Sequence, residues 1–241
     1  MLVATRNPLN IGAAARAMSN FGFQHLCVVN PYQVAFREAR SAVGASALLA
    51  GAEEFKTVAE AVADCTLVVG TTAVGRRELR HPLRRLEDGA RAIRKRLASS
   101  SVALLFGSEK VGLSNEDLSQ CDWLMRIPTR EVHRSVNLGQ AVAISLYELA
   151  RSTKAARAPQ KRLPALAGKP ATAGDLERIT VMLLDALRAS GSLKTRSEVI
   201  TGEKLRRLLR RHKLSAADAE FWLGMLRQIV WKLQSTRDST S

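Results

Sequence analysis

Residues 102–113, VALLFGSEKVGL, decide the fold class of this 241-residue chain. The segment begins with five consecutive apolar residues, and a glycine and a polar loop follow at once. A strand that is apolar at every position is covered on both faces, which is typical of a parallel sheet between two layers of helices. Similar runs occupy residues 2–5, 25–30, 66–71 and 123–128, and residues 102–107 complete the set.

Helical patterns alternate with these strands. They cover residues 10–21, 39–50, 57–63, 84–98 and 115–120, and a long amphipathic stretch at 136–152 follows, with Ser135 as its expected N-cap. This alternation predicts an α/β fold with a mostly parallel sheet flanked by helices.

The second part of the chain has a different composition. Residues 155–173 contain three prolines and little periodicity, which is typical of a linker. Helical patterns follow at 174–190, 202–212 and 215–234. We therefore expect a first domain at 1–154, a linker at 155–173 and a basic, all-α domain at 174–241. The last of these helices, rich in large apolar residues, also fits a simple packing role.

The charge indicates a polyanionic partner. The chain carries a formal charge of +15, of which +11 falls in residues 151–241 and +4 in residues 1–150. Such an excess favours nucleic acid as the partner. No apolar run reaches the roughly 18 to 20 residues that cross a bilayer, and no secretory signal pattern opens the chain, so we expect a cytoplasmic protein with no membrane contact.

Cysteine usage argues against a metal site. Cys27, Cys65 and Cys121 are widely spaced, without a CxxC pair or a neighbouring histidine cluster. We expect reduced, mostly buried thiols and no bound metal.

Unusual residues follow the predicted strands, at the edge where open α/β sheets bind ligands. After the first strand, Asn10 is suited to cap a helix, and Gly12 and Arg16 share one helix face. This spacing favours a role for Arg16 in binding a phosphate or ribose. The alternative is a surface arginine on an amphipathic helix.

An arginine-rich segment follows the third strand. Five arginines fall within ten residues, a density that suits backbone phosphates, although an isolated charge run is often only a solvated face. They are Arg76, Arg77, Arg80, Arg84 and Arg85, and the predicted helix 202–212 adds Arg206, Arg207, Arg210 and Arg211.

The last two strands also end in loops suited to a ligand. Gly107 lets a ligand lie against the main chain, and Glu109 can hold the amides of its loop. Ser135 and Asn137 lead into the long helix, whose first-turn amides suit polar ligand groups. His133 fits either a base or a solvated loop residue. Walker and dinucleotide-binding glycine motifs are both missing.

Three motifs in this order resemble the knotted methyltransferases of the SPOUT superfamily, and within it the TrmH-like RNA ribose 2′-O-methyltransferases. They are NIGAAAR at 10–16, FGSEKVGL at 106–113 with Ile127-Pro128, and SVNLGQA at 135–141. The basic helical extension is similar to that of the TrmJ type, which implies methylation of cytidine or uridine at tRNA nucleotide 32, the first of the anticodon loop.

The resemblance implies a parallel sheet with a deep C-terminal trefoil knot, a homodimer across the knot and S-adenosylmethionine as cofactor. Arg16 matches the chief catalytic residue of the family, and four further positions match residues that line its site: Asn10, Glu109, Ser135 and Asn137. The implied cofactor contacts are Thr71, Thr72, Ala73, Gly107, Ile127, Arg134, Ser135, Val136 and Leu138. Gly139 departs from the family pattern, where serine or alanine is frequent.

Two alternatives stay open. A related enzyme acting on ribosomal RNA shares every knot motif, and a non-catalytic RNA-binding protein can have the same fold. Since an arginine keeps its proton at ordinary pH, we expect Arg16 to clamp the ribose and its phosphate rather than act as a base.

Overall fold

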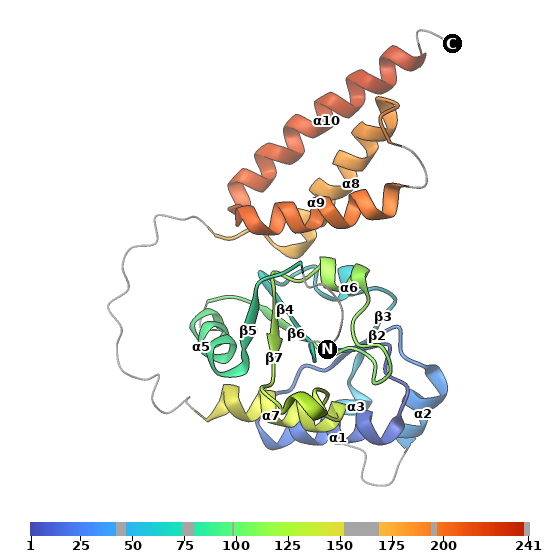
Figure 1. Cartoon of the computed structure of the whole chain (residues 1–241). Coiled ribbons are helices and arrows are strands. Elements are labelled where there is room, and N and C mark those ends of the chain that lie inside the picture. The colour runs from blue at the N-terminus through green and yellow to red at the C-terminus, as the bar shows by residue number, and fades with distance from the viewer. Residues whose placement is uncertain (42–46, 74–79, 98, 152–168, 194–196, 239–241) are drawn as a thin grey trace.

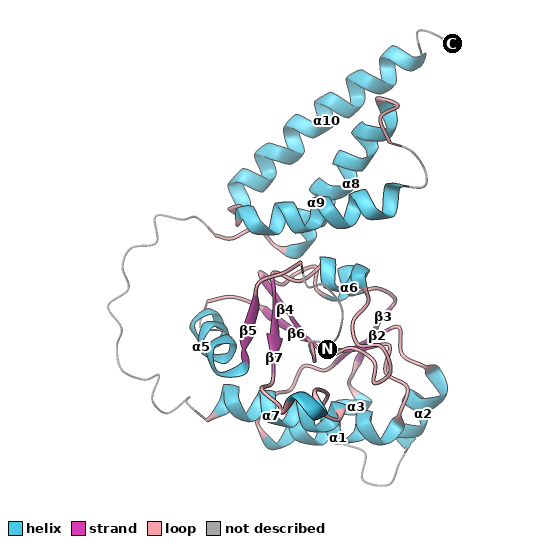
Figure 2. Ribbon diagram, viewed as in Figure 1, coloured by secondary structure: helices cyan, strands magenta, loops and turns pink. Residues whose placement is uncertain are grey.

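A computed structural model describes residues 1–41, 47–73, 80–97, 99–151, 169–193 and 197–238. Its centre is a parallel sheet in two parts, which are joined through one bridge (Figures 1 and 2). One part has the order β1 (Leu2–Val3), β2 (Cys27–Val29), β3 (Glu53–Phe55), and the other has the order β5 (Leu83–Arg85), β7 (Trp123–Arg126), β4 (Leu67–Thr71), β6 (Val102–Leu105).

The bridge joins the two parts at β1 and the end of β6. Leu2 pairs with Phe106, the backbone N–H of Val3 donates to the Phe106 carbonyl at 2.8 Å, and the N–H of Phe106 donates to the Met1 carbonyl at 3.0 Å. The described strands therefore form one continuous parallel sheet of order β3-β2-β1-β6-β4-β7-β5.

Helices cover both faces of this sheet (Figure 2). In the first part of the chain they are α1 (Pro8–Asn20), α2 (Gln33–Ser41), α3 (Ala47–Ala50), α4 (Val58–Ala61), α5 (Leu86–Leu97), α6 (Asn115–Ser119) and α7 (Leu138–Ala150), with a 3₁₀ turn at Glu131–His133. Alternate strand residues enter two separate cores: Val69 and Met125 join α1, α5 and α7, whereas Val68 and Leu124 face α4 and α6. Both faces are therefore apolar, as the uninterrupted runs predicted.

The sequence predicted five of the described strands and missed the two at the edges of the sheet. β3 reads EEF and β5 reads LRR, and each is exposed for most of its length. Edge strands need no apolar face on the open side, so neither carries the predicted pattern. The helix expected at 84–98 was therefore placed too early, because residues 84 and 85 belong to β5 and the helix begins at Leu86. The helix expected at 39–50 is instead α2 and α3, with residues 42–46 outside the described ranges.

Both expected helix caps were wrong. Asn7, not Asn10, caps α1, since its side chain accepts the N–H of Leu9 at 2.9 Å and Pro8 occupies the first helical position. Asn137, not Ser135, caps α7 by accepting the N–H of Gln140. In each case the cap lies two or three residues from the one expected, and Asn10 is thereby left to bond with Glu109 and Asn137.

The C-terminal helices α8 (Ala173–Ala189), α9 (Glu198–His212) and α10 (Ala216–Asp238) share a core of their own (Figure 1). They also contact the sheet region. The N–H groups of Ala173 and Gly174 donate to the carbonyls of Cys65 and Ala63, both at 2.8 Å. Within the described ranges, no helix is long and apolar enough to span a membrane.

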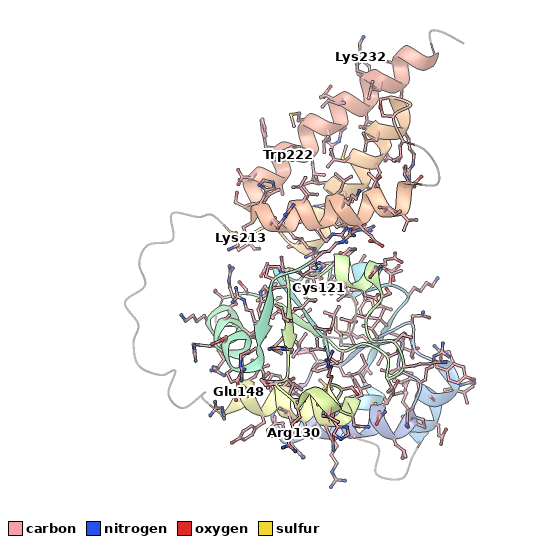
Figure 3. The ribbon with its side chains drawn as sticks, in the orientation of Figure 1. Cys121, Arg130, Glu148, Lys213, Trp222 and Lys232 are labelled. Carbon is pink, nitrogen blue, oxygen red and sulfur yellow. The ribbon has the colours of Figure 1, made fainter. Side chains whose placement is uncertain are left out.

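A buried arginine holds α9 against the amino end of β7. The Arg210 side chain is 4% exposed; its guanidinium donates to Gln120 Oε1 at 2.9 Å and lies 3.7 Å from Asp122 Oδ2. That carboxylate also accepts the N–H of Val68 at 2.7 Å. Burial raises the pKa of Asp122, although Arg210 acts in the opposite direction. Figure 3 labels Cys121, between these two partners in sequence, at the end of the sheet that faces α9.

A second ion pair extends this junction. Glu177 on α8 accepts two hydrogen bonds from Arg206, at 2.8 and 2.7 Å, and one from Gln120. Gln120 thus links both pairs, and the C-terminal helices are fixed to the sheet by a connected polar network rather than by apolar contact alone.

We expect Arg210→Met to lower the free energy of unfolding by about 3 kcal/mol or more, because Asp122 and Gln120 then lose a buried partner. Denaturant unfolding followed by circular dichroism measures the change. Arg91→Gln is the control: it breaks an exposed pair with Asp88, and we expect a loss below about 1 kcal/mol. A loss in Arg210→Met no larger than in the control contradicts the assignment.

Candidate functional site

A cavity of about 590 Å³ lies at the carboxyl ends of β4, β6 and β7. Three loops line it: the one after β4, the one after β6, and the one between β7 and α7. All nine residues predicted to contact a cofactor line the cavity, namely Thr71, Thr72, Ala73, Gly107, Ile127, Arg134, Ser135, Val136 and Leu138. Of the residues predicted for catalysis, Asn10, Glu109, Ser135 and Asn137 line it as well.

The loop after β6 folds back tightly on itself. A Cβ at Gly107 would lie 2.2 Å from the backbone of Gly112 and Leu113, so only glycine fits there. The N–H of Gly112 donates to the Ser108 carbonyl at 2.9 Å, and Gly112 itself has a φ of +70°. The tight turn brings the residues from Gly107 to Leu113 together at the wall of the cavity.

The Glu109 carboxylate ties this loop to the segment after β1. Its Oε1 accepts hydrogen bonds from Asn10 Nδ2 at 3.0 Å and from the N–H of Asn7 at 3.2 Å, and its Oε2 accepts the N–H of Arg6 at 3.2 Å. Asn10 Oδ1 in turn accepts Asn137 Nδ2 at 2.8 Å. One carboxylate and two amides thus connect the loops from β1, β6 and β7.

These donors keep Glu109 ionised. Burial on its own would raise the pKa of Glu109, but the hydrogen bonds from Asn10 and from backbone N–H groups outweigh it and hold the pKa below its ordinary value. With its lone pairs directed at these donors, the carboxylate is suited to position the loops rather than to take up a proton.

Two residues expected near the site lie outside the cavity. Arg16 is exposed on α1 and does not line this chain's cavity. His133 is exposed in the 3₁₀ turn and does not line it either. The space above Gly12, which was expected to permit a close approach, is open, since a Cβ at this position would meet no described atom within 4 Å.

Gly139, the departure from the family pattern, has a packing role. A Cβ at this position would lie 2.7 Å from Ala13 Cβ. Glycine therefore lets α1 and α7 approach closely, which brings Asn10 and Asn137 within hydrogen-bond distance.

The arginines predicted to bind RNA fall into three groups. Arg76 and Arg77 lie outside the described residues. Arg80, Arg84, Arg85 and Arg211 are exposed, and the Arg84 guanidinium lies 4.7 Å from the centre of the Trp123 ring. Arg85 also forms an exposed pair with Glu87 at 3.5 Å. The remaining three are less exposed and are engaged in side-chain pairs: Arg206 with Glu177, Arg207 with Glu203, and Arg210 with Asp122.

Sequence reasoning missed several residues that line the cavity, among them Leu118, Met125, Ala141 and Ser145. Ser145 is fully buried, and its Oγ has no hydrogen-bond partner among the described residues. A buried polar atom without a partner at a cavity wall suits a polar ligand group. Ser145 lies on the buried face of α7, the helix expected at 136–152, but only the tertiary fold directs it to the cavity.

The described residues form no second site with the chemistry of a metal centre. They contain no cluster of three or more histidine, cysteine or acidic side chains suited to a metal ion. The cysteines are free thiols; burial raises the pKa of Cys121 to about 12 and that of Cys65 to about 11.

Comparison with known proteins identifies the family of this site. The model of the SpoU rRNA Methylase family matches residues 1–147. The chain belongs to the SpoU rRNA methylase family. The resemblance expected from the three motifs is thereby confirmed.

Relatives within the family match almost the whole chain. A protein named tRNA (cytidine/uridine-2′-O-)-methyltransferase TrmJ from Sodalis glossinidius is 34% identical over 95% of this chain and 89% of its own length. The TrmJ of Klebsiella pneumoniae is also 34% identical, over 95% of this chain and 94% of its own.

Two solved structures of methylase-related proteins have folds similar to that of this chain. The crystal structure of TrmJ from Z. mobilis matches with a TM-score of 0.79 and 31% identity over 95% of this chain and 96% of that one. A probable methylase family protein from Haemophilus influenzae matches with a TM-score of 0.58 and 28% identity, over 98% and 96%.

We expect Gly107→Ala to weaken binding of S-adenosylmethionine, the methyl donor expected for this family, by more than about tenfold, because the added Cβ displaces the Gly112–Leu113 backbone. Isothermal titration measures the affinity. Gly224→Ala in α10, where a Cβ meets nothing within 4 Å, is the matched control. Equal affinity in both variants contradicts this prediction.

The lowered pKa of Glu109 predicts how the stability of the protein changes at acid pH. The folded protein holds the pKa of Glu109 below the unfolded value of 4.5, so its contribution to stability is present above that pH and is lost as pH falls through the folded pKa. We expect Glu109→Gln to lose less stability than the unchanged protein between about pH 6 and pH 3, as measured by urea unfolding. Equal losses of stability in the two proteins would contradict the role of ionised Glu109 in holding the loops together.

Proposed function

We propose that this protein transfers a methyl group from S-adenosylmethionine to a ribose 2′-hydroxyl of tRNA. Membership of the SpoU methylase family supports RNA methylation, and relatives named for tRNA cytidine/uridine 2′-O-methylation align over 95% of the chain. The observation that carries the proposal is the cavity at the carboxyl edge, where every predicted cofactor residue gathers.

The residues of the cavity fit this cofactor. The Gly107 turn offers main chain that no Cβ obstructs, and Ser145 Oγ is a buried polar atom without a partner among the described residues. The loops at Thr71–Ala73 and Arg134–Leu138 would hold the remaining polar groups. When bound, the sulfonium supplies an electrophilic methyl group.

The protein's own task is alignment. A ribose hydroxyl must lie within about 3 to 3.5 Å of the methyl group and in line with the bond that breaks. The clamp formed by Glu109, Asn10 and Asn137 fixes the loops that border this position. Its carboxylate has a lowered pKa and already accepts three hydrogen bonds, so it is a poor proton acceptor and the proton of the hydroxyl passes to phosphate or water.

Arg16 supplies the cationic group in this proposal, from a second copy of the chain. It is exposed on α1 and does not line its own cavity, so one chain alone holds an incomplete site. The planar guanidinium, permanently charged, would clamp the ribose and its phosphate and stabilise developing alkoxide charge.

A homodimer through α1 and α7 is part of the proposal. Outward residues on both helices recur at helical spacing, and several large apolar side chains among them are exposed: Leu9 at 80%, Tyr147 at 54% and Ile144 at 40%. Arg16 shares this outward ridge with Leu9. Contiguous exposed apolar residues of this kind mark protein interfaces, and an interface here would bring Arg16 to the partner's cavity.

The fold proposal includes the trefoil knot. β7 is inserted between β4 and β5, and α7, which follows it, packs on α1. This arrangement fits a chain end threaded through a preceding loop. We also propose that the C-terminal helices form a separate basic all-α domain after the linker at 155–173.

The proposed target is cytidine or uridine at nucleotide 32 of tRNA, in the cytoplasm. The exposed arginines Arg80, Arg84, Arg85 and Arg211, together with Arg76 and Arg77, would bind its backbone. Arg206 and Arg210 pair with residues outside α9, so we assign them to holding the helices instead, and Arg207 is paired with Glu203 within α9. Ribosomal RNA is the second candidate, because the family model is named for rRNA methylation.

The test is methylation in vitro. Purified protein, S-adenosylmethionine and unmodified tRNA or rRNA are incubated, and the digested RNA is analysed by mass spectrometry for 2′-O-methyl nucleosides. Product on tRNA alone supports the proposal, product on rRNA alone favours the second candidate, and no product on either overturns both.

We expect Arg16→Lys and Arg16→Ala each to lower kcat by about 100-fold or more, because lysine keeps the charge but loses the planar fork that stabilises the transition state. Arg91→Gln, an exposed change on α5, serves as the control. Near-normal turnover in Arg16→Lys would exclude this role of the Arg16 guanidinium.

A further inference from the structure

Three exposed side chains lie in a row beside the cavity. The parallel register pairs Leu2 with Val28 on one side and with Phe106 on the other. Past the strand ends, hydrogen bonds rather than strand pairing bring Tyr32, which follows β2, next to Thr5 and Arg6, and bring Arg6 next to Glu109, the neighbour of Lys110 in the loop after β6. The row crosses the carboxyl edge of the sheet where β1 meets β6.

Hydrogen bonds hold this row in place. The N–H of Tyr32 donates to the Thr5 carbonyl at 3.3 Å, and the N–H of Arg6 donates to Glu109 Oε2 at 3.2 Å. These contacts place the backbones of the three residues beside one another, from the segment after β2 to the loop after β6. Lys110 lines the cavity, whereas Arg6 and Tyr32 lie outside its lining.

The three side chains are not used within the described chain. Tyr32 is 54% exposed, and Arg6 and Lys110 are exposed as well. Among the described residues, none of the three takes part in an ion pair, ring contact or cation–π contact. By contrast, Arg84 lies over Trp123 and Arg40 over Phe36. The nearest carboxylate, Glu109, is already occupied by its three donors.

We propose that Arg6, Lys110 and Tyr32 form a nucleotide subsite for the substrate RNA, next to the ribose that is methylated. The two cations bind the flanking phosphates, and the phenol ring stacks on an unpaired base. The inference rests on the proposed function, because it assigns the RNA side of the same site.

The chemistry of the row fits a single-stranded nucleotide. Proteins bind RNA loops by contacting phosphates with lysine and arginine and by stacking splayed bases on aromatic rings. Two cations and one aromatic ring on neighbouring segments are the side chains that contact with phosphate and stacking of a base require. An anticodon loop supplies such unpaired bases.

The variants keep the backbone contacts of the row. Arg6→Gln retains the N–H that binds Glu109, and Tyr32→Ala retains the N–H that binds Thr5. Each purified variant is measured for its KM and kcat with tRNA, its tRNA affinity as a function of salt, and its affinity for S-adenosylmethionine. Arg91→Gln on α5 is the matched charge control.

We expect Tyr32→Ala to raise KM for tRNA by about tenfold, and Tyr32→Phe, which keeps the ring, to recover most of that loss. Arg6→Gln and Lys110→Gln should each weaken tRNA binding and reduce the slope of log affinity against log salt by about one. Affinity for S-adenosylmethionine in Arg6→Gln and Tyr32→Ala should match that of the unchanged protein.

The two proposals fail in different ways. If the unchanged protein methylates tRNA and the substitutions at Arg6 and Tyr32 leave KM and the salt slope at the level of Arg91→Gln, the subsite is wrong and the proposed function stands. If S-adenosylmethionine affinity falls together with tRNA affinity, the row has only a structural role. If the unchanged protein neither binds nor methylates tRNA, the proposed function itself fails.

Discussion

The Glu109 carboxylate is the contact on which the candidate site depends. It accepts the backbone N–H groups of Arg6 and Asn7 and the amide of Asn10, whose own oxygen accepts Asn137. Residues from three different strand ends are thereby held in one arrangement. An ionised carboxylate with satisfied lone pairs is a rigid anchor, because charge-assisted hydrogen bonds are stronger than neutral ones. The start of α1 and the backbone of Arg6 are thereby fixed against the loop after β6.

The two ends of the sheet serve different purposes. At the carboxyl end, the loops that follow the strands form the cavity wall, and at the amino end Asp122 pairs with Arg210 from α9. β7 connects both, since Asp122 precedes it and Met125 near its end lines the cavity. The C-terminal helices are thus anchored at the end opposite their own chain's cavity. An RNA that contacts both must extend along the molecule, as a folded tRNA does.

Arginine in this chain has two kinds of use. Arg206 and Arg210 are enclosed by carboxylates and amides and join the helices to the sheet, whereas Arg6, Arg16 and Arg211 are exposed. Net charge alone does not separate the two groups. A buried guanidinium needs oxygen partners in several directions, and these come from segments far apart in the sequence, such as Gln120 and Glu177.

The sequence by itself determined the parallel α/β fold, the central strands and the loops that carry a ligand, and the family resemblance of those loops implied nine of the residues that line the cavity. Uninterrupted apolar runs such as 102–106 record burial on both faces, and the loop residues that follow them record a ligand edge. Tertiary structure alone decided what depends on contacts between distant segments. The edge strands β3 and β5 form only because neighbours supply their hydrogen bonds, and Gly139 has a purpose only where α7 crosses Ala13. Periodicity reports how deeply a segment is buried, but the partner against which it is buried is fixed by the fold.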